Sequence, residues 1–423
     1  MKKIINQLRS CYLIMFSGLL LLTACNKALE EFPPIATPTY PSGKGIAATI
    51  ASTPNDSLYS RLIIRSGMAA ILNDSTKSFT IFATDNAGMR LFTSAASGGA
   101  IKPTDPDAIH SAFIANSLPV ATAQAIISYN TVGQKFPSSS IPTTLPNYPL
   151  PTQIILDPTQ PFVRMPIFPA KGTTFSYVNN LPLTAVDQVA SNGIIHHTFT
   201  IVAPLPASPL ITLSSLISTD ANLTYFKAAI ARGDSGQVGI SGVGKYGLQF
   251  DSLLRYPITN MTVLAPNNAA CQTLIFNTVY GTLIAQGVPP ATAAATATSI
   301  ASTPAGFNAL PVDAVRGVVA YHILASKNTG SYKPDIRTFS VNFSSAANSY
   351  VTTLVNGTVA AHPGILAQAT FTGPSVTALK FTGLGTFPPG GAPFSGGAAN
   401  ATSWDKMALN GVLHIIDKVL LPQ

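Results

Sequence analysis

The chain reads Asn410-Gly411-Val412-Leu413-His414-Ile415-Ile416-Asp417-Lys418-Val419-Leu420-Leu421-Pro422 close to its end. The Asn-Gly step favours a tight turn between strands, because glycine accepts positive φ. The apolar run that follows predicts a buried strand. This stretch therefore predicts a strand that completes a domain and is entered through a turn.

The same pattern occurs twice in the chain. Residues 192–196 read NGIIH and repeat the closing stretch. Further upstream, residues 78–87 read SFTIFATDNA and residues 260–269 read NMTVLAPNNA. Each of these is an apolar β-type run that ends in a polar turn and enters a helix, for which Asp85 and Asn267 are suitable N-caps. The mature chain therefore contains two copies of one repeated sequence pattern.

A third landmark lies between the other two in each copy. Tyr321-His322 follows an apolar stretch in the second copy, and Tyr129-Asn130 follows one in the first. Taken together, the three blocks resemble the fasciclin family. The resemblance implies an α+β fold: two tandem fasciclin-like domains, each a twisted β-wedge with packed helices. It also implies structural roles for a set of motif residues, with the histidines in core hydrogen bonds. These residues are Asn192, Gly193, His196, His322, Asn410, Gly411 and His414.

The repeat and the flanking composition divide the chain into four parts. Residues 1–24 are a signal peptide, 25–44 a Pro-rich spacer, 45–206 a divergent first domain, and 207–423 a second domain with insertions. The first copy departs from the family pattern at Thr84, where proline is usual, and at Asn130, where histidine is usual. We also expect a helix over 57–72, a long Pro-rich excursion over 136–171, a short extra helix over 289–304 and a loop over 383–398.

The N-terminus has the features of a bacterial lipoprotein signal. Lys2, Lys3 and Arg9 form a positive region, and the apolar run from Cys11 to Leu22 is shorter than the ~20 residues that a spanning helix needs. Leu22-Thr23-Ala24-Cys25 then resembles a lipobox, in which the Cys25 thiol accepts the lipid. The protein is thus expected to attach to a membrane through lipid on Cys25.

Asn26 bears on which membrane that is. In the lipoproteins that this one resembles, Asp directly after the cysteine favours retention in the inner membrane, whereas this chain has Asn26. We therefore expect an outer-membrane lipoprotein that is surface-exposed or faces the periplasm. The prolines of the spacer make it extended and semi-rigid.

Composition excludes several classes of function. Charged residues make up 9% of the chain and apolar residues 46%, and the formal charge of +8 includes no Lys/Arg run beyond Lys2-Lys3. A nucleic-acid reader would show a clustered basic face, so no nucleic-acid partner is expected. Cys271 is the single cysteine after Cys25, which excludes an intrachain disulfide and a Cys-rich zinc site.

Three short motifs match known functional sequences, and each also has a purely structural or chance interpretation. Arg232-Gly233-Asp234 is the tripeptide that integrins read, and its place at the end of a helix predicts an exposed loop. Gly242, Gly244 and Gly247 match the dinucleotide fingerprint, but Gly/Ser-rich surroundings favour a loop instead. Asp-Ser pairs such as Asp56-Ser57 resemble an O-glycosylation sequon, although helix capping by the aspartate is the preferred interpretation.

No catalytic or metal-binding pattern appears, so we expect neither an enzyme nor a cofactor. A GxSxG nucleophile elbow and a His-x-x-x-His pair are both absent. The sequence thus favours a lipid-anchored cell-envelope protein for adhesion or binding, with extracellular polysaccharide, a host glycan or an envelope protein as its ligand. The alternative is an accessory lipoprotein of a glycan-uptake system. The oligomeric state stays open.

Overall fold

The computed structural model describes residues 42–143, 147, 149–206, 209–236, 249–257, 259–328, 331–357, 362–385 and 398–422. The described residues from Ser42 onward form one compact unit. We call residues 42–206 the N-terminal half and residues 207–422 the C-terminal half. Whether these halves are separate domains with the expected boundary at residue 206 stays a prediction.

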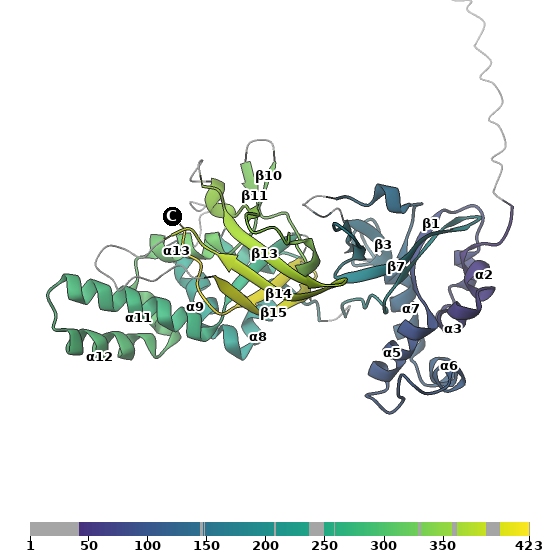
Figure 1. The fold of residues 1–423 in the computed structure, drawn as a ribbon, viewed down its shortest axis with the longest axis horizontal. Helices are drawn as coiled ribbons and strands as arrows, with labels where there is room; N and C mark the ends of the chain where they lie inside the picture. The colour runs from purple at the N-terminus through teal and green to yellow at the C-terminus, as the bar shows by residue number, and fades with distance from the viewer. Residues whose placement is uncertain are drawn as a thin grey trace, which may run out of the picture. The chain divides into compact units, whose positions relative to one another are not determined.

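The N-terminal half contains one mixed sheet and a group of helices (Figure 1). Its strands run in the order β4-β3-β2-β1-β8-β7-β6-β5. The helices are α2 (Ile46–Ala51), α3 (Ser57–Ser66), α4 (Ala69–Leu72), α5 (Asn86–Ala96), α6 (Asp107–Asn116) and α7 (Val120–Tyr129). The strands are β1 (Phe79–Thr84), β2 (Thr131–Val132), β3 (Leu150–Ile155), β4 (Arg164–Ile167), β5 (Pro169–Lys171), β6 (Ser176–Val178), β7 (Leu181–Ala190) and β8 (Gly193–Thr198).

The C-terminal half repeats this plan with a sheet in the order β12-β13-β14-β15-β16-β9 and a two-stranded ribbon. Its helices are α8 (Leu213–Thr219), α9 (Thr224–Gly233), α10 (Phe250–Arg255), α11 (Asn268–Ala285), α12 (Pro290–Ala301) and α13 (Val312–Tyr321). Its strands are β9 (Met261–Pro266), β10 (Ser326–Asn328), β11 (Ser331–Lys333), β12 (Tyr350–Val351), β13 (Ile365–Thr372), β14 (Ser375–Thr382), β15 (Ala399–Ala408) and β16 (Gly411–Ile416).

One parallel strand pair occurs in each half, in the middle of the N-terminal sheet and at one end of the C-terminal sheet. β1 pairs with β8 so that Phe79 lies opposite Gly193, and β9 pairs with β16 so that Met261 lies opposite Gly411. The first long strand of each half is therefore joined to its last. All six residues of β1, β9 and β16 are buried, as is usual for parallel strands covered on both faces.

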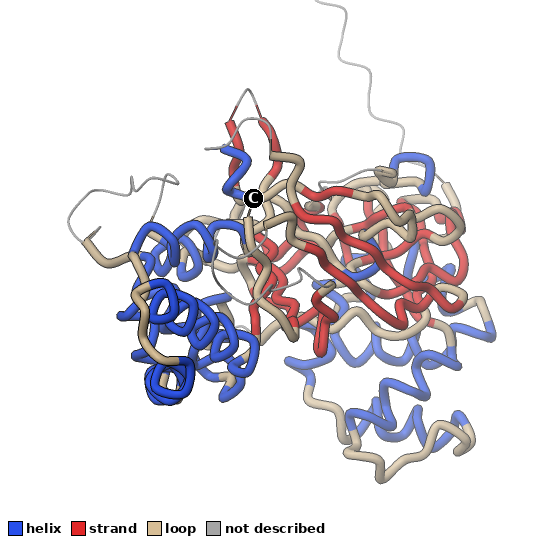
Figure 2. Tube along the Cα trace, turned by 60° about the vertical axis from the view of Figure 1, so that its left-hand side comes forward, coloured by secondary structure: helices blue, strands red, loops and turns tan. Residues whose placement is uncertain are grey.

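Helices and strands separate within each half, and the apolar core lies between them (Figure 2). The fold is therefore α+β, as the sequence predicts. Asp85 and Asn267 cap α5 and α11, accepting hydrogen bonds from Gly88 N and Ala270 N at 2.9 Å. The repeated sequence predicts both caps, and the structure confirms them.

Three segments show where local sequence patterns succeed and fail. The helix expected over 57–72 stops at Ser66, because Gly67 adopts the left-handed conformation, and resumes as α4. The Pro-rich segment 136–171 is not a simple excursion, since it contains β3, β4 and β5. The helix expected over 289–304 is confirmed as α12. Most of the loop expected over 383–398 lies outside the described residues.

Candidate functional site

Some of the predicted site residues lie outside the described part of the chain. These are Cys25 with the signal and most of the spacer, and the glycines of the fingerprint match, Gly242, Gly244 and Gly247. The remaining predicted residues are all described, and they fall into two groups: the repeated Asn-Gly and histidine motifs, and the tripeptide Arg232-Gly233-Asp234.

The two motif asparagines make the same contacts in both halves. Asn192 Oδ1 accepts from Ile46 N at 2.9 Å, while its Nδ2 donates to Leu72 O and Asp74 O. Asn410 Oδ1 accepts from Leu213 N at 2.9 Å, while its Nδ2 donates to Leu254 O and Tyr256 O. Each buried amide thus ties the turn before the last strand to the start of the first helix and to the segment before the first long strand.

Glycine follows each asparagine for a reason other than the positive φ that the sequence predicts. Neither Gly193 nor Gly411 has positive φ, although both enter strands from a turn. A Cβ on Gly193 would lie 2.2 Å from Phe79 O, and one on Gly411 would lie 2.4 Å from Met261 O. Glycine is therefore required because the partner strand passes too close for a side chain.

The histidines of the closing strands lie in the core. His196 on β8 and His414 on β16 are fully buried, and their Nε2 atoms lie 2.9 Å from Phe136 O and Thr338 O. Burial lowers the pKa of both imidazoles. Both side chains pack against phenylalanine rings, Phe82 in the first half and Phe343 in the second.

His322 lies at the C-terminal end of α13 and joins two backbone segments. Its Nδ1 lies 2.7 Å from Val318 O, and its Nε2 accepts from Leu420 N at 3.0 Å. Because a backbone N–H only donates, Nε2 must be unprotonated, and Nδ1 carries the proton toward Val318 O. Burial lowers the pKa of His322 to about 4. The neutral ring therefore fastens the end of the chain to α13.

We expect the C-terminal half to lose stability as the pH falls from about 6.5 toward about 4. In this pH range the imidazole of His322 is protonated in the unfolded chain but stays neutral in the folded chain. Above pH 6.5 this imidazole is neutral in both states. The difference between the two pKa values corresponds to on the order of 3 kcal/mol. Urea unfolding at several pH values, followed by fluorescence of the only tryptophan, Trp404 on β15, measures it.

The N-terminal half supplies the control for this measurement. Asn130 occupies the equivalent place after α7, and its Nδ2 donates to Ile126 O, four residues back, at 2.8 Å. His322→Asn should therefore fold and should lose a large part of the pH dependence. A variant that keeps the whole pH dependence of the natural chain would contradict the role assigned to His322.

The tripeptide Arg232-Gly233-Asp234 is not exposed as the sequence predicts. Asp234 is 7% exposed, and its two carboxylate oxygens accept from Phe250 N at 2.8 Å and Asp251 N at 2.9 Å. Arg232 Nη2 donates to Leu310 O at 2.8 Å. Asp234 thereby caps α10 from the end of α9, and an adhesion role for the tripeptide loses its structural basis.

Asp234→Ala should lower the free energy of unfolding by about 2–3 kcal/mol, because two backbone N–H groups at the start of α10 lose a charged acceptor. Attachment to integrin-bearing cells should be unchanged once the folded fraction is matched. Asp234→Asn, which keeps one acceptor oxygen, should cost less. Loss of attachment in a fully folded Asp234→Ala protein would restore the adhesion hypothesis.

Asp56 also differs from its expected role. Its side chain does not cap α3, and instead its buried Oδ2 lies 3.0 Å from His197 Nε2, within hydrogen-bonding distance. His197 is next to His196 on β8 and points to the other face, as alternation along a strand requires. Ser57, the serine of the sequon, is exposed.

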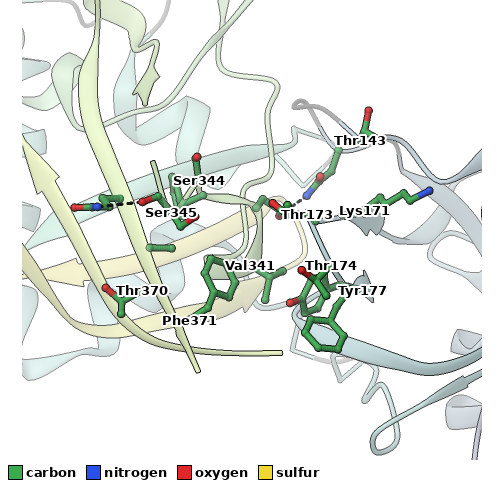
Figure 3. Close-up of a pocket in the computed structure, with 18 of the residues that line it drawn as sticks. Thr143, Lys171, Thr173, Thr174, Tyr177, Val341, Ser344, Ser345, Thr370 and Phe371 are labelled. Carbon is green, nitrogen blue, oxygen red and sulfur yellow. Dashed lines mark hydrogen bonds between the residues drawn. The ribbon is translucent and has the colours of Figure 1, made fainter. Parts of the chain in front are cut away.

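The structure brings a different set of residues together as a candidate site. A cavity of about 850 Å³ opens between β5 and β6 of the N-terminal half and β13 of the C-terminal half. We call it the cleft. Figure 3 shows Thr173, Thr174 and Tyr177 on one side, and Ser344, Thr370 and Phe371 on the other. Its volume lies within the range of ligand sites in proteins.

Next to the cleft lining, side chains of the two halves are in contact. The guanidinium of Arg337 lies 4.4 Å from the centre of the Phe168 ring and donates from Nη2 to Leu409 O at 2.7 Å. Burial lowers the pKa of Arg337 to about 10, so it stays charged at neutral pH. Beside it, Asn147 Nδ2 donates to Arg337 O at 2.9 Å and to Asn342 Oδ1 at 2.5 Å.

Titratable groups are scarce among the described residues that line the cleft. Lys171 and Tyr177 are the two present, and Tyr177 already donates its hydroxyl to Pro374 O at 3.0 Å. The described residues of the whole chain also contain no cluster of three or more His, Cys, Asp or Glu side chains suited to a metal ion. Sequence reasoning missed the cleft, because its walls come from segments far apart in the chain.

A search for helices able to cross a membrane found no single candidate among the described residues. One bent pair, α6 with α7, passes by length and composition with an angle of 106° between its members.

Comparison with models of known protein families gave no match, and neither did comparison with curated proteins. Among solved structures, the chain is similar to a FAS1 domain pair from the insect cell adhesion molecule fasciclin I. The identity is 11%, the match covers 86% of this chain and 96% of the other, and the TM-score is 0.32. That solved pair comes from the same family that the repeated sequence blocks of this chain resemble.

Proposed function

We propose that the protein is a lipid-anchored cell-envelope protein that binds an extracellular ligand in the cleft and catalyses no reaction. The carrying observation is the cleft itself. It is built from both halves, has the volume of a ligand site, and presents no carboxylate, imidazole or thiol among its described lining residues. General acid–base and nucleophilic catalysis depend on such groups.

The lipid anchor supports the location of this binding. Acyl chains on Cys25, followed by a semi-rigid spacer, would hold the cleft at a membrane surface. The candidate ligands are those expected from the sequence: extracellular polysaccharide, a host glycan or an envelope protein. Asn26 favours the outer membrane as the site of anchoring.

Cys25→Ala should move the protein from the membrane fraction to the soluble fraction, because the residue that carries the lipid is gone. Cell fractionation with labelled palmitate measures this change, and protease treatment of whole cells reports surface exposure. Cys271→Ala is the matched control, since Cys271 is a buried free thiol and should leave the membrane fraction unchanged. Membrane attachment of the Cys25→Ala protein would refute the anchor.

The binding role is tested by retention of the purified full chain on immobilised envelope polysaccharides, host glycans and envelope proteins. Binding of a ligand in the cleft should be lost in Thr174→Trp, because Thr174 is exposed on the cleft wall and the larger tryptophan side chain would occupy the space of the ligand. Retention of every ligand by the Thr174→Trp protein would contradict binding in the cleft.

A further inference from the structure

We infer that the ligand of the cleft is an uncharged oligosaccharide, an assignment that rests on the proposed binding function. Three properties of the described lining residues lead to it: the lack of charge inside the cleft, the aromatic side chains on its walls, and a set of hydroxyl groups without protein partners.

Charge excludes the strongly ionic ligands. The described lining residues contain one cation, Lys171, and no carboxylate. Lys171 is exposed, and Figure 3 shows its ammonium group pointing away from the middle of the cleft. Phosphate groups and acidic peptides are recognised by clustered arginines and lysines, which the described walls do not provide. The interior of the cleft therefore suits a neutral ligand.

The strand edges beside the cleft exclude an extended peptide. A peptide that adds a strand needs free backbone groups on the edge that it joins. Lys171 N on β5 already donates to Pro142 O at 2.9 Å. On β13, Ala367 N and Ala369 N donate to Ser349 O and Ser344 O, both at 2.9 Å. These three edge groups are thus already bonded to the chain's own loops.

The aromatic side chains offer surfaces for sugar rings. Phe371 on β13 and Phe175 before β6 are each partly exposed, and they come from opposite walls. The faces of a pyranose ring carry C–H groups, which pack on aromatic rings and leave the hydroxyls directed outward. Two such surfaces in one cleft match more than one sugar unit.

The hydroxyl groups of the walls complete the match. Thr143, Thr173, Thr174, Thr370 and Ser345 are exposed, and their hydroxyls make no hydrogen bond within the described part of the protein. A hydroxyl both donates and accepts, as does each hydroxyl of a sugar. Gln368 Nε2 donates to Ser345 O at 3.1 Å, and its amide oxygen accepts no hydrogen bond from the described residues. The lining therefore recognises a polyhydroxylated, uncharged molecule.

Affinity electrophoresis of the purified full chain in gels containing a neutral glucan, a neutral mannan, a polyuronate or a sulfated glycan tests this inference. At least one neutral polysaccharide should retard the protein, and Phe371→Ala should weaken that binding about tenfold or more. Phe162→Ala is the matched control, because Phe162 is 77% exposed and lies outside the cleft. Thr173→Val removes a hydroxyl from the cleft wall and should also weaken binding of the neutral polysaccharide. Thr122→Val on α7 is its control, and both threonines are exposed, so neither change should disturb folding.

The outcomes separate the inference from the proposed function. Neutral binding that is lost in Phe371→Ala and Thr173→Val but kept in both controls supports the oligosaccharide. Binding of only the anionic glycans, or of a protein ligand that Thr174→Trp abolishes, overturns the oligosaccharide and leaves the proposed function in place. If Phe371→Ala and Thr173→Val bind a neutral polysaccharide as strongly as their controls do, the cleft is not the binding site. That result overturns both the oligosaccharide assignment and the proposed binding in the cleft.

Discussion

Gly411→Ala should lower the free energy of unfolding of the C-terminal half by about 3–5 kcal/mol. The added methyl group would lie 2.4 Å from Met261 O and 2.6 Å from Leu213 Cδ1, and the carbonyl belongs to the neighbouring strand of the parallel pair. Neither β9 nor β16 can move apart without breaking the hydrogen bonds of this parallel pair. Urea unfolding followed by Trp404 fluorescence measures the loss.

Two further substitutions serve as controls for Gly411→Ala. Gly193→Ala meets the equivalent contact with Phe79 O and should act mainly on the N-terminal half, with a smaller effect on the Trp404 signal. In Gly67→Ala the added Cβ has no atom within 4 Å, so the only cost is the left-handed φ of +73°. This strain should lower the free energy of unfolding by about 1 kcal/mol. Equal losses at Gly411 and Gly67 would show that close approach of the strands is not the cause.

Asn410→Ala should also cost about 3–5 kcal/mol, because two buried backbone groups and one partly buried group lose their partner at once. These are the N–H of Leu213 and the carbonyls of Leu254 and Tyr256. The side chain is 0% exposed, so water does not replace the lost bonds without a rearrangement. Thermal unfolding of the full chain, observed by circular dichroism and by Trp404 fluorescence, gives the loss for the C-terminal half.

Asn192→Ala provides the companion measurement, since Asn192 makes the corresponding three bonds in the N-terminal half. The two single losses should be similar in size. Asn400→Ala is the control in the same half as Asn410, since the bond from Asn400 Nδ2 to Asp417 Oδ2 is exposed to solvent. A loss at Asn410 no larger than that at Asn400 would contradict the role of the buried amide.

The parts of the fold that the sequence predicts are those decided by neighbouring residues. The caps at Asp85 and Asn267, the strands that carry His196 and His414, and the helix after Pro290 all depend on short-range patterns. The strands within 136–171 were missed because prolines argue against strands. Pro166 and Pro169 lie on β4 and β5, the two edges of the sheet, where a missing backbone N–H is tolerated.

The candidate site was beyond reach of local patterns. Asp234 appears as part of an exposed tripeptide until the fold brings Phe250 and Asp251 to its carboxylate, and the intervening residues give no sign of that pairing. The cleft is lined by Asn147 and Asn342, whose amides are hydrogen-bonded although they belong to separate segments of the two halves. Only the folded chain places Thr174 and Phe371 across one cavity.

The parallel pairing of β9 with β16 also bears on how the protein folds. β9 lies near the start of the C-terminal half and its partner is formed by residues 411–416 at the other end of that half, so the two strands pair only after the chain between them has folded back. β1 and β8 stand in the same relation in the N-terminal half. Pairings between strands so far apart in sequence form slowly. Each half should therefore fold slowly and complete its sheet only when its last strand is added.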